Sequence, residues 1–173
     1  MRKLYLFLLF LPFIEACETS AGLADETVEA YVPVYKSYEE MSQVRLDPSK
    51  KLEKSGKIYI YKTALLISEP GQGVHIFDNR DSRKPKRLNF IAVPGNRDME
   101  LKDNILYVDN GLDLVTIDIS DIENMKVLNR TKDVFPYPMY PDREGVKFVC
   151  PDPSKGYVVD WVLDNVEDPK CYR

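Results

Sequence analysis

From residue 57 onward, short runs of β-branched and aromatic residues alternate with clusters of Gly, Pro, Asn and Asp. Runs of this length and composition, bounded by turn-forming residues, predict β-strands. No segment of this part shows a sustained helical period, so we expect the body of the chain to be all-β. The predicted strands are residues 57–61, 64–68, 73–78, 105–109, 114–119 and 156–162.

The beginning of the chain has a different pattern. Arg2 and Lys3 precede an apolar run from Leu4 to Ile14. A membrane-spanning helix needs roughly 20 apolar residues, so this run is too short to cross a bilayer. A short apolar run behind two cations is typical of a secretory signal peptide. A buried N-terminal helix is the alternative interpretation.

Residues 14–17 (IEAC) resemble the lipobox of bacterial lipoproteins, which has an aliphatic residue three positions before a cysteine and a small residue directly before it. The resemblance implies that residues 1–16 are a lipoprotein signal peptide and that Cys17 is acylated and becomes the new N-terminus. Acyl chains at about 0.8 kcal/mol per buried CH₂ would then hold the protein on a membrane. Glu15 departs from the usual small residue at its position, which leaves an ordinary signal peptide, cleaved near Ala16 or Ala21, as the alternative.

A short helix is predicted between the N-terminus and the strands. Ser37 is a suitable N-cap, and Glu40 stands at the spacing of a capping box, which predicts a helix over residues 38–44. Asp47 and Pro48 would end it. The predicted organisation is a signal peptide (1–16), a polar flexible tether (17–30), an N-terminal segment with a possible short helix (31–56) and a β-repeat domain (57–173).

The strand region contains an internal repeat. Residues 74–81 align with residues 114–121 at an offset of 40, and the strands before them, at 58–60 and 106–108, correspond with a different gap. A period near 40 in an all-β chain is typical of propeller blades or a related β-repeat. A fainter third copy is predicted around Trp161.

The repeated unit, a strand followed by Asp-x-x-Asp and then Pro-Lys, resembles the LVIVD repeat, with LVTIDISD at 114–121 the closer match and HIFDNRD at 75–81 the looser one. Residues 31–136 resemble the small LVIVD-repeat lipoproteins of Bacteroidetes-type bacteria. The resemblance implies a β-propeller-like fold and an outer-membrane lipoprotein, with no established activity. A closed propeller needs at least about four blades of about 40 residues. This chain has room for two blade-like repeats and a partial third at most, so the unit is either open or completed by association.

Composition narrows the function. The chain has 173 residues, 44% of them hydrophobic, and a net charge of −4 from 24 basic and 28 acidic residues. A mildly acidic chain is not typical of a nucleic-acid-binding protein, so we expect no nucleic acid among its partners. No cofactor, P-loop or metalloprotease motif occurs, and we expect no cofactor. Once Cys17 is acylated, Cys150 and Cys171 remain, and an oxidising compartment would permit a bridge between them.

Two groups of residues are candidates for chemistry. Asp78, Asp81, Asp118 and Asp121 recur in register in the two copies. Paired carboxylates can hold a metal or supply an acid and a base, but Asp at a strand end commonly accepts a hydrogen bond from the following turn. The repetition favours the second interpretation. His75, the single histidine, lies within a predicted strand where its counterpart is Val115, which favours packing over catalysis.

Two surface segments are candidates for binding. Residues 80–87 include five cations, which suit a solvated hairpin or contact with anionic headgroups or polysaccharide. Residues 135–141 (FPYPMYP) are rich in Pro and aromatic rings, so Phe135, Tyr137 and Tyr140 form either a rigid connector or a surface that stacks on sugars or docks a partner.

These observations predict an exported, lipid-anchored outer-membrane protein whose β-repeat body binds an envelope protein or a glycan without catalysis. The alternative is a metal-assisted hydrolase that uses the repeated aspartates.

Overall fold

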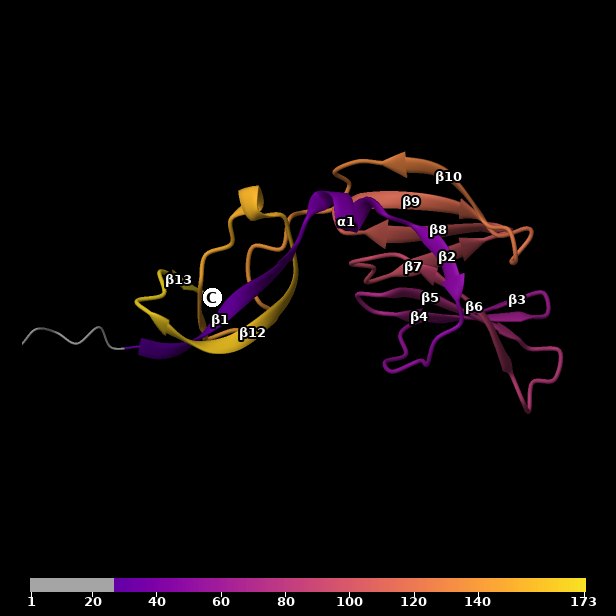
Figure 1. Ribbon diagram of the computed structural model, residues 1–173, viewed down its shortest axis with the longest axis horizontal. Coiled ribbons are helices and arrows are strands. Elements are labelled where there is room, and N and C mark those ends of the chain that lie inside the picture. The colour runs from indigo at the N-terminus through magenta and orange to yellow at the C-terminus, as the bar shows by residue number, and fades with distance from the viewer. Residues whose placement is uncertain (1–26) are drawn as a thin grey trace, which may run out of the picture.

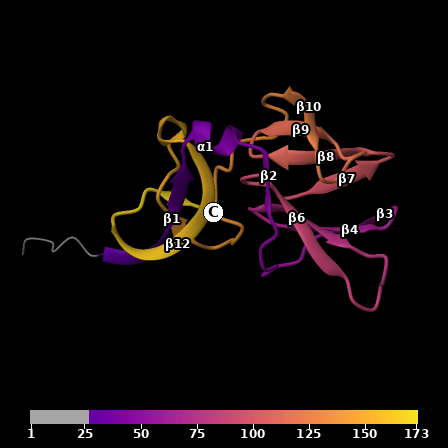
Figure 2. The same ribbon diagram turned by 45° about the vertical axis from the view of Figure 1, so that its right-hand side comes forward.

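A computed structural model describes residues 27–173 and arranges them as two lobes joined by a short helix (Figure 1). The terminal lobe combines residues 27–36 with residues 134–173, and the repeat lobe comprises residues 45–131. A view turned by 45° also separates the two lobes (Figure 2). The fold is mostly β and contains three separate sheets, none of which closes on itself. The prediction of a β-sheet body is therefore confirmed.

The first sheet of the repeat lobe has the strand order β2-β6-β5-β4-β3. Strands β3 to β6 are consecutive antiparallel neighbours, and β2 pairs with the outer edge of β6. The strands are β2 (Arg45–Pro48), β3 (Ile58–Tyr61), β4 (Ala64–Glu69), β5 (Gly73–Asp78) and β6 (Lys86–Ala92).

The second sheet repeats this four-stranded antiparallel meander in the order β10-β9-β8-β7. Its strands are β7 (Met99–Lys102), β8 (Ile105–Asn110), β9 (Asp113–Asp118) and β10 (Lys126–Thr131). The turn between β4 and β5 spans residues 70–72, whereas that between β8 and β9 spans only residues 111–112. Because of this one-residue difference, counterparts before the turn, such as Ala64 and Ile105, are 41 residues apart, and counterparts after it, such as Gly73 and Asp113, are 40 apart. The predicted correspondence of residues 58–60 with 106–108 is wrong, because β3 is the counterpart of β7, whereas residues 106–108 lie in β8, the counterpart of β4.

The two copies also share a β-bulge. The pairing register shifts between Ile76 and Phe77 in the first sheet and between Val127 and Asn129 in the second. In each case the unpaired residue is a leucine of the last strand, Leu88 or Leu128, as the pairing registers require. The repeat seen in the sequence therefore corresponds to a repeat in backbone structure.

The hydrophobic core lies between these two sheets. Leu66, Val74 and Ile76 of the first sheet and Leu106 and Ile117 of the second are at most 1% exposed and belong to one cluster. Alternation along each strand places these residues on one face. Burying large aliphatic side chains on a shared face is the main force that holds two such sheets together.

The terminal lobe is built from the two ends of the described chain. Its sheet has the order β12-β1-β11-β13. β1 pairs antiparallel with β12 along its whole length and parallel with β11 at Tyr31 and Phe148. Cys150 and Cys171 form a disulfide that closes a loop with a sequence separation of 21. The elements are β1 (Thr27–Lys36), β11 (Lys147–Phe148), a 3₁₀ turn (Pro153–Lys155), β12 (Tyr157–Glu167) and β13 (Cys171–Tyr172).

The structure corrects three features of the predicted organisation. Residues 27–30 belong to β1 and not to the tether, because they pair with β12 and bury Ala30. Residues 31–56 are not a separate segment, since β1 and β2 enter different sheets. The predicted third copy around Trp161 lies in β12, whose partner is β1, so it is not a third meander. In all three cases the structure depends on strand pairing between segments far apart in the sequence, which a local sequence pattern does not reveal.

The helix α1 (Tyr38–Ser42) begins as predicted and ends earlier. Ser37 caps it, and Glu40 completes the capping box through bonds in both directions. It ends at Ser42 and not at residue 44, because Arg45 already belongs to β2, which also includes Asp47 and Pro48. No helix within residues 27–173 has the length and apolar character that crossing a membrane requires.

The joint between the lobes is tightly packed. Met41 of α1 is buried, and its carbonyl accepts a hydrogen bond from Asn110 Nδ2 at 2.7 Å. The same amide donates to the carbonyl of Pro94 at 2.6 Å. Gly95 has a φ of +70°, a conformation that favours glycine, and a Cβ there would lie 2.4 Å from the terminal methyl of Met41, which would have to move. Tyr157 of β12, also buried, lies against the same position.

Candidate functional site

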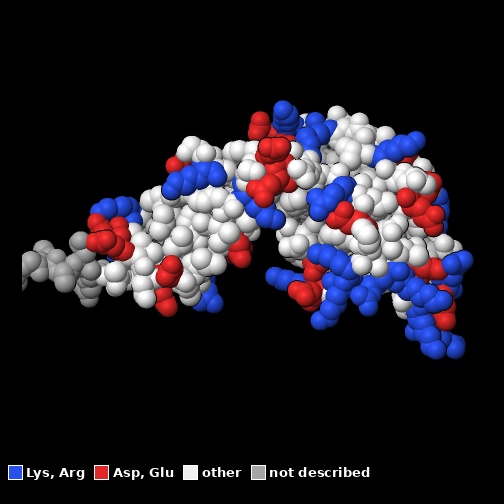
Figure 3. Space-filling view, in the orientation of Figure 1, with Lys and Arg blue, Asp and Glu red and all other residues white. Residues whose placement is uncertain are grey.

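A cleft of about 900 Å³ lies where the two lobes face each other. Four segments that are distant in sequence form most of its walls. The terminal lobe contributes residues 136–142 and residues 157–161 at the start of β12, and the repeat lobe contributes residues 70–72 and 95–97 of two turns. The surface narrows where the lobes meet (Figure 3). A cleft between structural units is a common location for ligand sites, which typically measure about 300–1,000 Å³.

Aromatic rings line the terminal-lobe wall of the cleft. Tyr137 is half-buried and donates its hydroxyl to the carbonyl of Gly156 at 2.7 Å. Its ring meets that of Tyr157 edge to face at a centroid distance of 6.0 Å. Burial, with smaller contributions from nearby Tyr35, Tyr38 and Asp152, raises the pKa of Tyr137 to about 12. This ring is therefore held in a fixed orientation by contacts on two sides.

Tyr140 and Trp161 add two more rings to the cleft. Tyr140 is 52% exposed, and the guanidinium of Arg173 lies 4.1 Å from the centre of its ring. Trp161, the single tryptophan of the chain, is half-buried and packs edge to face on Phe148 at 5.6 Å. The Tyr and Trp side chains thus combine a packed side with a surface that a ligand can reach.

Charged side chains surround these rings. Lys36, Lys54 and Arg97 contribute cations to the cleft lining, and Asp142 and Asp160 contribute carboxylates. All five are exposed. The mixture of signs suits hydrogen bonding to hydroxyl and amide groups better than capture of a highly charged polymer.

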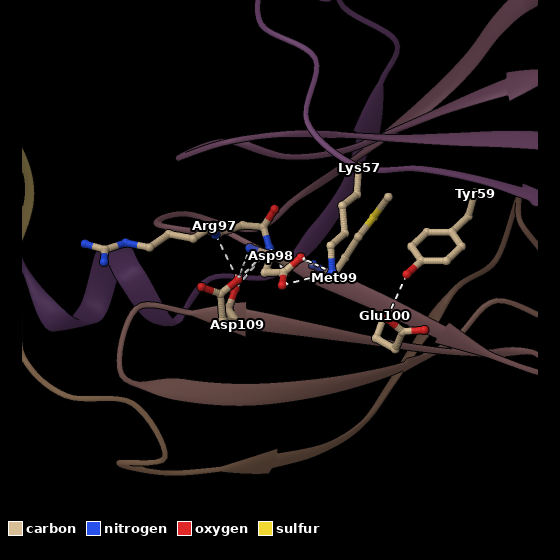
Figure 4. A network of polar contacts seen from close by, with 8 residues as sticks. Lys57, Tyr59, Arg97, Asp98, Met99, Glu100 and Asp109 are labelled. Atoms are coloured by element: carbon tan, nitrogen blue, oxygen red, sulfur yellow. Dashed lines mark hydrogen bonds and ion pairs between the residues drawn. The ribbon is translucent and has the colours of Figure 1, made fainter. Parts of the chain in front are cut away.

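The position of Arg97 is set by a buried carboxylate. Asp109 Oδ1 accepts hydrogen bonds from the backbone N–H groups of Arg97 and Asp98, each at 2.8 Å, and from Asn96 Nδ2 at 2.9 Å. Burial raises the pKa of Asp109, although these hydrogen bonds oppose the change. Figure 4 shows the Arg97 side chain extending away from this network. The backbone from which Arg97 reaches the cleft is therefore firmly held.

The site residues predicted from the sequence are the aromatic residues of the Pro-rich segment, the lipidation site and the possible disulfide. Tyr137 and Tyr140 line the cleft, whereas Phe135 is not part of its lining, although it is 37% exposed. The backbone N–H of Phe135 donates to the carbonyl of Leu112 in the repeat lobe, so this end of the segment also connects the lobes. Cys17, the predicted lipidation site, lies outside the described residues. Cys150 and Cys171, the possible disulfide that the sequence left open, are joined by a bridge.

Each of the four repeated aspartates accepts a hydrogen bond from the backbone of its own turn. Asp78 and Asp118 each accept from the backbone N–H two residues later, at 3.0 and 2.8 Å, and Asp81 and Asp121 do the same at 3.1 and 3.0 Å. These are Asx-type turns, which agrees with the structural interpretation. No group of three or more acidic, His or Cys side chains suitable for a metal is found in residues 27–173.

His75 is packed in the first sheet. It is 1% exposed, its Nε2 lies 2.7 Å from Glu69 Oε2, and its ring contacts Phe90 at a centroid distance of 4.7 Å. Lys50 extends over the same phenylalanine ring and pairs with Glu69. This cluster joins residues 50–54 to the sheet, and His75 itself is not part of the cleft lining.

Arg97 and Trp161 are candidate site residues that sequence reasoning missed. Neither lies in a motif, and both reach the cleft only because the lobes meet. No protein-family model, curated protein or solved structure matches this chain.

Proposed function

We propose that this protein is an exported outer-membrane lipoprotein whose body is a binding module, and that its ligand is a saccharide chain held in the cleft between the lobes. In this proposal the two meander sheets are propeller-blade-like repeats, Cys17 is the acylated anchor, and the protein is not an enzyme. The observation that carries the binding proposal is the cleft wall formed by Tyr137, Tyr140 and Trp161.

Several properties of the cleft favour a saccharide. Ring faces of Tyr and Trp provide rigid apolar surface, which a sugar ring can cover with its C–H groups. Exposed Lys36, Arg97, Asp142 and Asp160 surround this surface and can exchange hydrogen bonds with hydroxyl groups. The volume is large enough for several sugar units and lies within the usual range for ligand sites. An extended polypeptide is the second ligand class that the test must distinguish.

The fold and the ends of the chain support the remaining parts. The repeated four-stranded meander has the period and strand order of a blade. The resemblance of residues 14–17 to a lipobox supports the anchor, and the disulfide suits an oxidising compartment. The hydrolase alternative has no support in the geometry, because Asp78, Asp81, Asp118 and Asp121 each bind their own turn.

The single tryptophan provides a direct test of binding. The fluorescence of Trp161 is measured in the full chain while oligosaccharides released from the outer membrane, or peptidoglycan fragments, are added. We expect a saturable change in wild type that is lost in Tyr137→Ala and Tyr140→Ala. Phe135→Ala is the matched control, since it removes an exposed ring of the same segment outside the cleft lining, and it should retain the response.

The opposing results are equally clear. If Trp161 fluorescence does not change with any saccharide but responds to extended peptides, the ligand is a polypeptide and not a saccharide. An equal loss in Phe135→Ala would show that the cleft is not the site. Mass spectrometry of the mature N-terminus tests the anchor separately: we expect an acylated Cys17 that disappears when signal peptidase II is inhibited. An unmodified chain beginning elsewhere would remove the anchor from the account.

A further inference from the structure

The two sheets of the repeat lobe contact each other through faces that are not equivalent. The pairing register aligns β4 with β8 and β5 with β9. In the first sheet, we call the face that carries Leu66 and Ile76 the forward face. Their counterparts in the second sheet are Tyr107 and Thr116, which define its forward face. The rear face is the opposite one. The core forms where the forward face of the first sheet meets the rear face of the second, which carries Leu106 and Ile117.

The contact between the sheets is therefore head to tail. Leu66 and Ile76 on the forward face of the first sheet are 0% and 1% exposed, and Leu106 and Ile117 on the rear face of the second are 0% exposed. A head-to-tail contact between repeated units leaves one forward face and one rear face without a partner within the chain.

The forward face of the second sheet is one of these two faces. It carries Ile105, Tyr107, Leu114 and Thr116, and none of these side chains is fully buried. Their counterparts in the first sheet are Ala64, Leu66, Val74 and Ile76, which are at most 2% exposed. The apolar and β-branched character of the face is thus retained in the second copy, although nothing in residues 27–173 covers it to the same degree.

The rear face of the first sheet is the other. Ile58 and Ile60 of β3 are 58% and 71% exposed, and Leu65 and Phe77 beside them are half-buried. The half of this face near β6 is covered by residues 50–54, but the half near β3 is open. The counterpart of Ile58 in the second sheet, Met99, is 2% exposed.

We propose that a second copy of this chain covers these faces, with the forward face of the second sheet of one copy packed on the rear face of the first sheet of the other. The occupant is a second copy because its open rear face is the counterpart of the face that already fits a forward face inside the chain. The internal interface therefore provides the pattern for the external one. This inference rests on the blade-like repeat of the proposed function and not on the ligand of the cleft.

Charge supports the same head-to-tail order. Lys57 and Asp98 are counterparts that precede β3 and β7, and they pair with each other at 2.8 Å. Tyr59 and Glu100, two residues further, are also counterparts and are joined by a 2.7 Å hydrogen bond (Figure 4). Equivalent positions of adjacent sheets thus lie side by side with complementary groups, and a docked copy would continue this alternation with its own Lys57 beside Asp98.

The turns at the far end of the sheets alternate in the same way. The turn after β5 and the start of β6 carry five cations against Asp81: Arg80, Arg83, Lys84, Lys86 and Arg87. The turn after β9 carries Asp121 and Glu123, and Lys126 begins β10. Equivalent turns of neighbouring sheets lie at the same end, so a docked copy brings its basic turn beside the acidic turn of the first. Two copies contain four such sheets and three copies contain six, both within the range of known closed propellers.

Mass measurement by analytical ultracentrifugation, on the full chain extracted in mild detergent, tests this interface. We expect wild type to form a discrete dimer or trimer. Ile60→Glu alters only the rear face and Tyr107→Glu only the forward face, and each should raise the dissociation constant about 100-fold or more, because an unpaired charge is placed in an apolar contact. Leu163→Glu is the matched control, since it places the same charge at an exposed apolar position of the terminal lobe, and it should leave the assembly intact.

Mixing the two variants provides a readout that misfolding cannot imitate. Each variant retains the face that the other has lost, so an equimolar mixture should form a heterodimer through one intact contact, while each variant alone stays monomeric. A wild type that is monomeric up to about 100 µM, a mixture that stays monomeric, or equal dissociation of Leu163→Glu would each overturn the proposal. Loss of the oligomer with an intact saccharide response of Trp161 would leave the proposed function in place.

Discussion

Glu69 holds a buried charge in the first sheet, and replacing it with glutamine tests how strongly that charge stabilises the repeat lobe. The residue is 4% exposed. Its carboxylate lies 2.7 Å from His75 Nε2, pairs with Lys50 Nζ at 3.1 Å and accepts the backbone N–H of Glu53 at 3.1 Å. Glu69→Gln removes the charge while nearly preserving the shape of the side chain.

The size of the effect follows from the pKa of Glu69. Burial raises this pKa, but the hydrogen bonds from His75, Lys50 and the backbone of Glu53 together outweigh burial and lower it from 4.5 to about 2. At about 1.4 kcal/mol for each pH unit, the ionised carboxylate stabilises the fold by about 3 kcal/mol. Because the folded pKa lies below the unfolded one, this contribution is complete above the unfolded value and is lost as the pH falls through about 2.

Chemical denaturation between pH 7 and pH 2 measures this contribution. We expect Glu69→Gln to lose about 3 kcal/mol at pH 7 and to show a smaller decline in stability between pH 5 and pH 2 than wild type. Glu53→Gln is the matched control, since it removes an exposed carboxylate of the same cluster and keeps the backbone bond. Parallel stability curves for wild type and Glu69→Gln across this acidic range would refute the reasoning.

Three further predictions concern the terminal lobe and the joint. Tyr137→Phe should cost about 1 kcal/mol through the lost hydrogen bond to Gly156. Because the folded pKa of Tyr137 is raised from 10 to about 12, wild type should lose stability as the pH rises through this interval. In an alkaline titration followed by circular dichroism, the variant should lack that decline. Replacing Cys150 and Cys171 with serine should lower the free energy of unfolding by about 3 kcal/mol, measured by urea denaturation, and a loss near zero would contradict this. Asn110→Ala should cost about 2 kcal/mol, because the buried carbonyl of Met41 and the partly buried carbonyl of Pro94 lose their donor, and an unchanged thermal midpoint would disprove that assignment.

The strands with strong local signals could be predicted from the sequence. β5 has the predicted bounds, residues 73–78, and β8 differs by a single residue. The capping box of Ser37 and Glu40 was also evident, because its signal is local. β10 (KVLNRT) was not predicted as a strand, because four of its six residues are polar and its conformation is set by pairing with β9.

The candidate site was predictable only in part, for a related reason. The aromatic segment containing Tyr137 and Tyr140 stands out in composition, and the structure places both rings in the cleft. Phe135 has the same local pattern but lies outside the lining. Arg97 and Trp161 carry no local signal, because the cleft exists only where β12 and a turn of the repeat lobe meet. Pairing of β1 with β12, more than a hundred residues apart, creates that arrangement.

Nuclear magnetic resonance tests most directly whether the cleft between the lobes binds a saccharide, as we propose. Chemical shifts of the backbone and of the aromatic rings are recorded while the oligosaccharides that alter Trp161 fluorescence are added. We predict saturable changes confined to the cleft, at Arg97, Tyr137, Tyr140 and Trp161, with Phe135 unaffected. Changes confined to the open sheet faces, or none at all, would contradict the claim.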